Sequence, residues 1–219
     1  MSAVFVTGAT GTVGSSLVAE LLARGERVIA AVRSPADAAR LPDGAEAREF
    51  DFEQYLRRTG APFTNLRPNF FMQNLSTTYA DEIRERGEID VPAGRAFTAF
   101  IDARDIGRVG AVVLSEPGHE RRSYTLSGEQ SLSYSGVAKI MTEVLGRPIR
   151  YTRPSERDYL AMLAAKGLPA DYIDVQRMIY RVVRLNISAL PNRAVRRLTG
   201  SPATTFRRFV EDSREVWTG

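Results

Sequence analysis

Three glycines stand in a fixed pattern after the first apolar segment of the chain. Residues 4–6 (Val-Phe-Val) run into Thr-Gly-Ala-Thr-Gly-Thr-Val-Gly, and an amphipathic pattern follows at once. In such a loop the first glycine allows a sharp turn, the second lets backbone N–H groups reach a pyrophosphate, and the third lets the helix pack close to the strand. The alternative is an ordinary strand–turn–helix built from small residues. The residues that we expect to bind the phosphates of a dinucleotide are Gly8, Thr10, Gly11, Thr12, Val13 and Gly14.

A second candidate site follows the next apolar segment, at Arg33 and Ser34. An NAD-specific protein has Asp or Glu at this point, where the carboxylate accepts a hydrogen bond from the ribose 2′-OH. A guanidinium instead pairs with a 2′-phosphate, and a serine hydroxyl adds a donor. The sequence therefore favours NADP(H); the alternative is a solvated arginine at a strand end. Asp51 and Phe52 end the third segment, where an adenine edge and face would lie, although Phe52 could equally be core.

The elements that must position these residues read as β-α-β-α-β over the first fifty or so positions. Residues 27–33 are almost continuously apolar, as expected for a parallel strand buried on both faces, and residues 46–52 alternate. The pattern predicts an α/β fold, a Rossmann-like doubly wound parallel sheet, with residues 2–8 as its central strand. The apolar stripe that we expect on the first helix is Val13, Leu17, Val18, Leu21 and Leu22.

The second half of the chain offers a candidate substrate site after a short strand at Phe63–Arg67. The carboxyl end of such a strand faces the ligand crevice, so we expect Asn69, Phe70 and Gln73 to contact nicotinamide or substrate. At least two of the three residues 70–72 are expected to be core. Helices are predicted over residues 75–86, 105–115 and 134–145, and strands over 97–101 and 123–126.

No catalytic residue can be assigned from the sequence. No Tyr-x-x-x-Lys occurs; Tyr134 and Lys139 are separated by one residue too many and lie on a segment that resembles a remote surface helix. His119, the only histidine, is expected in a solvated turn, and with no cysteine a metal site is not expected. A hydride transfer needs no protein nucleophile because the cofactor carries the chemistry, and a quinone could take its proton from water.

Composition and charge limit the partners. The 219 residues carry a net charge of +4, with Asp or Glu among most of the basic residues. We therefore expect a small-molecule substrate, no nucleic acid and no membrane, since no apolar run approaches about eighteen residues. A cytoplasmic location is the default for a chain without cysteines, and a homodimer is left open. We expect a nucleotide-binding domain over residues 1–150 and a mostly helical substrate or lid subdomain over residues 151–219.

Several motifs together resemble the NmrA-like family, atypical members of the short-chain dehydrogenase/reductase superfamily. They are the glycine loop, the strand end Ala-Ala-Val-Arg-Ser-Pro, residues 62–74, residues 100–107, residues 124–128 and the tail 199–217. The resemblance covers nearly all of the chain and implies NAD(P)(H) binding. Members of the family include quinone- and azo-type reductases, and also redox-sensing regulators that bind the nucleotide without turning it over.

The chain departs from the family pattern after Phe52. Residues 53–60 resemble the helix that precedes the family's sixth strand, so two βαβ steps, roughly sixty residues, are missing. The usual fourth and fifth strands would then be absent from the sheet. We expect residues 63–67 to take the vacant side of the first strand, directly or through a partner chain. The join is either native or marks a segment absent from this sequence.

Two functions remain open at this point. One is an NAD(P)H-dependent oxidoreductase of small, flat acceptors of the quinone or azo type. The other is a non-catalytic protein that senses NAD(P) and regulates a partner. Steady consumption of NADPH with a quinone would separate them.

Overall fold

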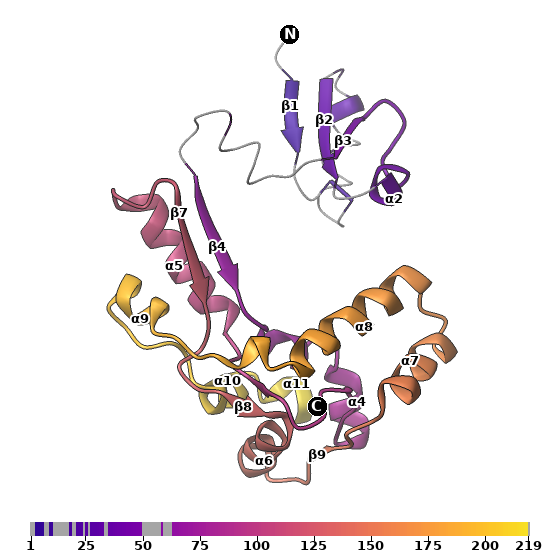
Figure 1. Cartoon of the computed structure of the whole chain (residues 1–219), viewed down its shortest axis with the longest axis vertical. Helices are drawn as coiled ribbons and strands as arrows, with labels where there is room; N and C mark the ends of the chain where they lie inside the picture. Colours follow the sequence, from indigo (N-terminus) through magenta and orange to yellow (C-terminus); the bar gives the residue numbers. More distant parts are fainter. Residues whose placement is uncertain are drawn as a thin grey trace. The chain divides into compact units, whose positions relative to one another are not determined.

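The computed structural model describes residues 3–6, 9–10, 18, 21–23, 25, 27–32, 35–49, 58 and 63–218. The chain forms two compact units, Met1–Phe63 and Thr64–Gly219. Figure 1 shows the elements of each unit, which we describe separately. Within the described part of the chain, no helix combines the length and the apolar character needed to cross a bilayer.

The first unit holds a parallel sheet of three strands, ordered β1-β2-β3. These are β1 (Ala3–Val6), β2 (Arg27–Val32) and β3 (Glu46–Glu49). Strand β2 is buried along most of its length, as its nearly continuous apolar sequence predicts. A short helix, α2 (Pro35–Ala38), lies between β2 and β3. The predicted parallel arrangement of the three segments is confirmed.

The core of the first unit also confirms part of the predicted helical stripe. Val18 is fully buried, and Leu21 and Leu22 pack against the same cluster as Val6 and Val28. Gly25 follows with a φ of +77° and donates its N–H to the carbonyl of Leu22 at 2.9 Å. Only glycine adopts this left-handed conformation without strain, so the turn back toward β2 depends on it. Val13 and Leu17 lie outside the described residues.

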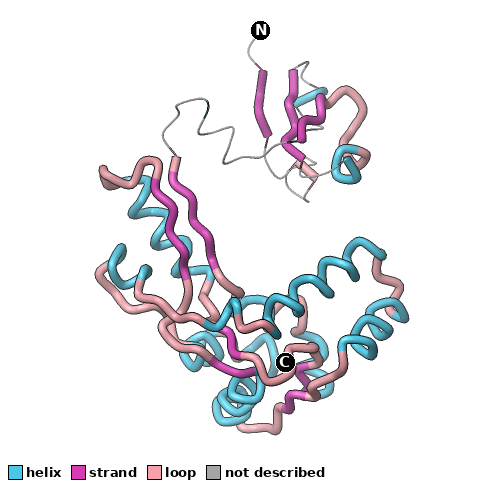
Figure 2. Tube along the Cα trace, viewed as in Figure 1, coloured by secondary structure: helices cyan, strands magenta, loops and turns pink. Residues whose placement is uncertain are grey.

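The second unit begins with a parallel strand pair and the helix that connects its strands along the chain. Strand β4 (Thr64–Pro68) pairs with β7 (Arg122–Leu126), and α5 (Ala103–Ser115) packs beside them. Figure 2 shows the two strands side by side with the helix next to them. Asp102 caps α5, because its carboxylate accepts from the backbone N–H of Arg104 at 2.8 Å.

The rest of the second unit is mostly helical. Two short strand pairs, one parallel and one antiparallel, connect its parts: β5 (Glu88–Ile89) with β9 (Arg150–Tyr151), and β6 (Phe97–Thr98) with β8 (Leu132–Ser133). The helices are η1 (Met72–Leu75), α4 (Ala80–Arg86), α6 (Tyr134–Leu145), α7 (Glu156–Ala165), α8 (Ala170–Arg184), η2 (Ile187–Ala189), α9 (Ala194–Thr199), α10 (Phe206–Asp212) and α11 (Glu215–Thr218).

One large core holds the helices of the second unit together. It joins residues before and after position 150, since Met141 on α6, Tyr180 on α8 and Phe209 on α10 belong to one buried cluster. Trp217 closes it by donating its indole N–H to the carbonyl of Leu75 at 3.0 Å. The expected functional division at residue 150 stays a prediction.

The predicted position of the first strand is wrong in the described sheet. Strand β2, not β1, is its middle strand, and β4 belongs to a different sheet. In the second unit, β4 pairs with β7 over five residue positions, from Thr64 opposite Arg122 to Pro68 opposite Leu126. This pairing uses one edge of β4, so the expected place of residues 63–67 beside the first strand stays a prediction. The join after Phe52 and the end of the third predicted strand lie outside the described residues.

The helix predicted over residues 75–86 begins later than expected. Residues 72–75 form a 3₁₀ turn, and α4 starts only at Ala80. The hydroxyls of Ser76 and Thr77 donate to the carbonyl of Gln73 at 3.1 and 2.8 Å. Side-chain bonds of this kind compete with the regular helical ladder, which explains the interruption.

Candidate functional site

The candidate site starts where β4 ends. Asn69 follows Pro68 and is fixed on two sides, because its side-chain amide donates to the carbonyls of Ala99 and Ser188 at 3.0 and 2.8 Å. Its backbone N–H donates to the carbonyl of Leu126 on β7. Asn69 therefore anchors the strand end to β6 and η2, and its amide N–H groups are used for structure.

The 3₁₀ turn η1 sorts its side chains onto two faces. Residues three apart eclipse one another in a 3₁₀ helix. Met72 and Leu75 point into the core, with 2% and 1% of their surface exposed. Phe71 and Asn74, also three apart, both line a surface groove. The sequence pattern Phe-Met-Gln-Asn-Leu thus places one aromatic ring and one amide together on the accessible side.

The groove has a volume of about 560 Å³. Its floor is the segment after β4 and its wall is one face of α8, continued by η2. Its lining is almost entirely apolar, which suits a flat hydrophobic ligand. The lining residues are Pro68, Asn69, Phe70, Phe71, Asn74, Met178, Ile179, Val182, Val183, Ile187 and Ser188.

Asn74 is the polar residue of the groove with a side chain available for a ligand. Its side-chain amide has no hydrogen-bond partner among the residues that the structure describes, whereas Asn69 and Ser188 are engaged with other groups. The sequence analysis did not select Asn74. The three-residue spacing from Phe71 could have identified it, had the turn been recognised as 3₁₀ rather than α-helical.

Phe70 lies two residues after β4, and its expected contact with a ligand stays a prediction. Its ring is half-buried and lines the groove, and it packs edge-on against Phe100 with centroids 6.3 Å apart. The Phe70 ring also contacts the ring of Tyr180, with the two centroids 6.2 Å apart. Met72 belongs to the core and Phe70 packs against it, as expected, whereas Phe71 remains 37% exposed.

Gln73 does not line the groove, so the structure does not bring it together with Asn69 and Phe70. Its amide donates to Asp102 Oδ1 at 2.9 Å, and its carbonyl oxygen accepts from the backbone N–H of Ala103 at 2.9 Å. The 3₁₀ geometry turns position 73 toward the start of α5. Its amide thus has a structural role, and its expected role as a substrate contact stays a prediction.

The predicted nucleotide-binding residues fall almost entirely outside the described residues. Among them Thr10 is described; it is half-buried, and its carbonyl accepts from Arg40 at 3.4 Å. Strand β2 ends at Val32, so Arg33 follows the strand directly in the sequence. The roles expected of Gly8, Gly11, Thr12, Val13, Gly14, Arg33, Ser34, Asp51 and Phe52 stay predictions.

The two residues weighed as catalytic acids lie elsewhere in the second unit. Tyr134 belongs to the core and is only 2% exposed, whereas Lys139 on the same helix is exposed, so Tyr134 lies on the buried face of α6. Burial raises the pKa of its hydroxyl well above 10, which makes it a poor acid. His119 lies half-buried in its turn, with Nδ1 2.8 Å from the hydroxyl of Tyr124.

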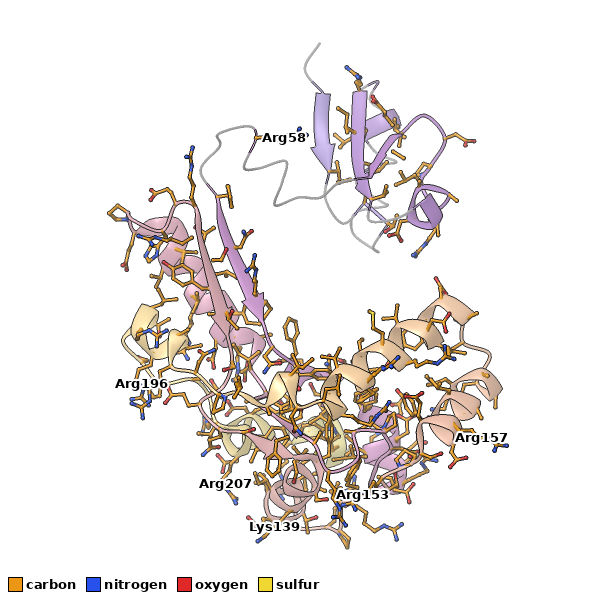
Figure 3. The ribbon with its side chains drawn as sticks, in the orientation of Figure 1. Arg58, Lys139, Arg153, Arg157, Arg196 and Arg207 are labelled. Atoms are coloured by element: carbon orange, nitrogen blue, oxygen red, sulfur yellow. The ribbon has the colours of Figure 1, made fainter. Side chains whose placement is uncertain are left out.

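Charged side chains of the second unit are spread over separate elements. Figure 3 labels Lys139, Arg153, Arg157, Arg196 and Arg207 at different places on its outer surface. Arg196 pairs with Glu129 at 2.8 Å, and Arg207 pairs with Glu143. Within residues 3–49 and 63–218, as far as they are described, no group of three His, Asp or Glu side chains could hold a metal ion.

Comparisons with known proteins show the family and the fold of this chain. Residues 45–185 match the model of the NmrA-like family, and residues 8–54 match an NAD(P)H-binding family model. The chain is 35% identical over 159 residues to the NAD(P)H azoreductase of Xenophilus azovorans, covering 73% of this chain and 55% of that protein. It is also 35% identical to the agroclavine dehydrogenase of Claviceps fusiformis over 161 residues, covering 72% of this chain and 56% of that protein. The chain spans about half the length of these curated relatives.

Solved structures share the fold. The Citrobacter sp. triphenylmethane reductase complexed with NADP(H) aligns with a TM-score of 0.67 and 20% identity, covering 95% of this chain and 99% of that one. The NADPH-dependent quinone oxidoreductase QOR2 from Escherichia coli, complexed with NADPH, aligns with a TM-score of 0.67 and 22% identity, covering 95% of this chain and 98% of that one. Fold and family models together define a Rossmann-type NAD(P)H-binding protein. The chain belongs to the NmrA-like family.

Proposed function

We propose that this chain is an NADPH-dependent reductase of small, flat acceptors of the quinone or azo type. The observation that carries the proposal is the apolar groove at the end of β4, with two phenylalanines and one unpaired amide, Asn74. In a parallel α/β fold, ligands bind outside the carboxyl ends of the strands. The names of the azoreductase and of the quinone reductase support the same kind of acceptor.

The described part of the first unit fits a dinucleotide. Its three strands run parallel, and β1 and β2 each end immediately before a predicted binding segment, the glycine loop in one case and Arg33-Ser34 in the other. The loop would hold the phosphates through backbone N–H groups, and Arg33 would pair with a 2′-phosphate. Bound NADPH would supply the hydride, which carries both electrons of the reduction.

The residues of the groove would bind and orient the acceptor. Phe70 and Phe71 provide apolar ring faces, and Met178 and Val182 on α8 provide the opposite wall. Asn74 would donate an N–H to an oxygen or nitrogen of the acceptor, where negative charge grows as the acceptor is reduced. An amide cannot supply the proton itself, so we expect the product anion to take it from water.

A test compares Asn74→Leu with the unaltered protein in the NADPH-dependent reduction of a benzoquinone. Loss of one donor to a developing anion costs about a hundredfold or more in kcat in other enzymes, and we expect a loss of at least about tenfold here. Asn65→Leu is the matched control, since Asn65 lies on β4 outside the groove and its side-chain amide donates to the hydroxyl of Ser123 at 3.4 Å. Binding of NADPH without any consumption in the unaltered protein would favour the sensing function and reject the reductase.

A further inference from the structure

Helix α8 has two apolar faces, and only one of them is used by the core. Tyr180 and Val183 are buried against the other helices of the second unit. A second row runs along the outside of the helix at spacings of three, four and three residues, which keeps its members in one line. We call this row the outer stripe. Its residues are Val175, Met178, Val182 and Leu185, and they are 46%, 61%, 39% and 66% exposed.

The outer stripe is continuous with the groove. Met178 and Val182, its two middle residues, line the groove wall, and Ile187 of η2 lines the groove just beyond the end of α8. Leu185 continues the line past the groove and is among the most exposed apolar residues of the second unit. From Met178 to Leu185 the helix rises about 10 Å.

Charge decides which end of the stripe can hold an apolar ligand. One turn before Val175 the same line reaches Asp171, an exposed carboxylate in the first turn of α8. The helix carries three arginines. At 100° per residue, Arg177 and Arg184 lie on another side, whereas Arg181 lies one turn before Leu185 and flanks the stripe. Arg177 is also paired with Asp174 at 2.6 Å. Toward Leu185, an apolar chain leaving the groove therefore meets Leu185 and the methylene stem of Arg181, whose guanidinium can stay in water. Toward Val175 it approaches the carboxylate of Asp171.

We propose that the acceptor carries an extended apolar chain, and that this chain lies along the outer stripe from Met178 to Leu185. The inference rests on the proposed function, since it places the flat, reducible head of the acceptor in the groove. It explains why the apolar row does not stop at the groove wall. A row one residue wide suits an alkyl or prenyl chain, and about 10 Å accommodates about eight methylene groups in extended form.

The experiment measures binding of a series of alkylbenzoquinones, with methyl, butyl, octyl and dodecyl chains, by equilibrium dialysis without NADPH. One-sided burial of each methylene should tighten binding about twofold, half the logarithmic gain of full burial. We expect affinity to rise steadily up to the octyl compound and to level off beyond it. Because no turnover is needed, the result does not depend on the proposed reductase activity. If affinity rises with chain length but NADPH is not consumed, the reductase activity is rejected and the binding of an apolar chain along the outer stripe is retained.

Two matched variants locate the chain. Leu185→Ser should remove most of the gain between the butyl and octyl compounds, whereas Val175→Ser, at the acidic end of the same stripe, should leave it intact. Both side chains are exposed, so neither change disturbs the core. Affinity that does not depend on chain length, or an equal loss in both variants, would overturn the proposal. So would a dimer in light scattering that Leu185→Ser dissociates, because a second copy would then cover the stripe.

Discussion

Gln73 and Asp102, 29 residues apart in sequence, are joined by a hydrogen bond of 2.9 Å. The same glutamine accepts from the N–H of Ala103, so its amide spans the start of α5. Arg104 holds the other side of the Asp102 carboxylate and reaches Asp212 on α10. Burial favours a raised pKa for Asp102, but the bonds from Arg104 and Gln73 outweigh it and lower the pKa overall. The turn that carries Asn74 is thereby fixed to an ionised, buried carboxylate.

Gln73→Leu should therefore weaken acceptor binding, although Gln73 itself does not line the groove in which we place the acceptor. The variant leaves the N–H of Ala103 without its partner and frees the turn, at a cost of about 1–3 kcal/mol in unfolding free energy. We expect a higher KM for a quinone and an unchanged KM for NADPH, measured by steady-state kinetics alongside a urea titration. Gln130→Leu, at an exposed position, is the control. A loss of stability with both KM values unchanged would make Gln73 a structural residue only.

The periodicity of the sequence predicted the fold well and the site only in part. Parallel strands were recognisable because β2 is a continuous apolar run, and the helix at 134–145 was predicted with its exact bounds. Gln73 was chosen, and Asn74 was not, because the segment after the strand end was placed at the crevice without a local conformation being assigned to it. The hydroxyls of Ser76 and Thr77 capture the Gln73 carbonyl, and such local competition leaves little trace in periodicity.

The wall of the groove could not be predicted from the sequence either. Helix α8 was recognisable as basic and helical, yet its outer stripe meets the segment after β4 only through tertiary packing. The side-chain amide of Asn69 illustrates the point, since it bonds to Ser188 across 119 positions of the chain. Contacts at such separations are set by the whole core rather than by local pattern.

The buried tyrosines predict how stability depends on alkaline pH. Among the tyrosines that the structure describes, burial raises the pKa of Tyr79, Tyr134, Tyr151, Tyr159 and Tyr180 above 10. In the unfolded chain these groups ionise near pH 10. Because the folded protein keeps them neutral, their contribution to stability is complete below about pH 10 and is lost as pH rises further.

Tyrosinate absorbance measures this directly. We expect the native protein to titrate at higher pH than the same protein in guanidinium chloride, and the free energy of unfolding to fall above about pH 10. The hydroxyls of Tyr79 and Tyr180, 2.5 Å apart, should be among the last to ionise. Coincident titration curves in the native and unfolded protein would contradict the burial of these rings.

Cofactor choice tests the prediction made for Arg33. One charge-assisted pair with the 2′-phosphate, about 1.5–3 kcal/mol, corresponds to a roughly ten- to hundredfold preference for NADPH over NADH. Arg33→Ala should remove most of it, as measured by titrating both nucleotides. Arg27→Ala is the control, since Arg27 begins β2 and pairs with Glu46 at 2.9 Å. Equal affinities in the unaltered protein would refute the role of Arg33.

The last prediction concerns the join between residues 52 and 53. The adenosine and phosphate half of the cofactor needs the glycine loop and Arg33, and the sequence has both. In related folds the nicotinamide half rests against the fourth and fifth strands, which we expect to be absent from this sequence. Hydride transfer requires the reacting atoms within about 3.5 Å, and poor positioning can cost a hundredfold or more. We therefore expect this chain to bind NADPH measurably but to reduce quinones slowly.

A chimera provides the comparison. The two missing βαβ steps of the 35% identical NAD(P)H azoreductase would be inserted between residues 52 and 53, and both proteins would be titrated with NADPH and then assayed with a benzoquinone. Similar NADPH affinities with faster turnover in the chimera are the expected outcome. An intact mass well above 24.2 kDa for the protein purified from its natural source would show separately that this sequence lacks a segment. If both proteins turn over equally fast, the nicotinamide is positioned without the inserted strands, and residues 69–74 become the first place to mutate.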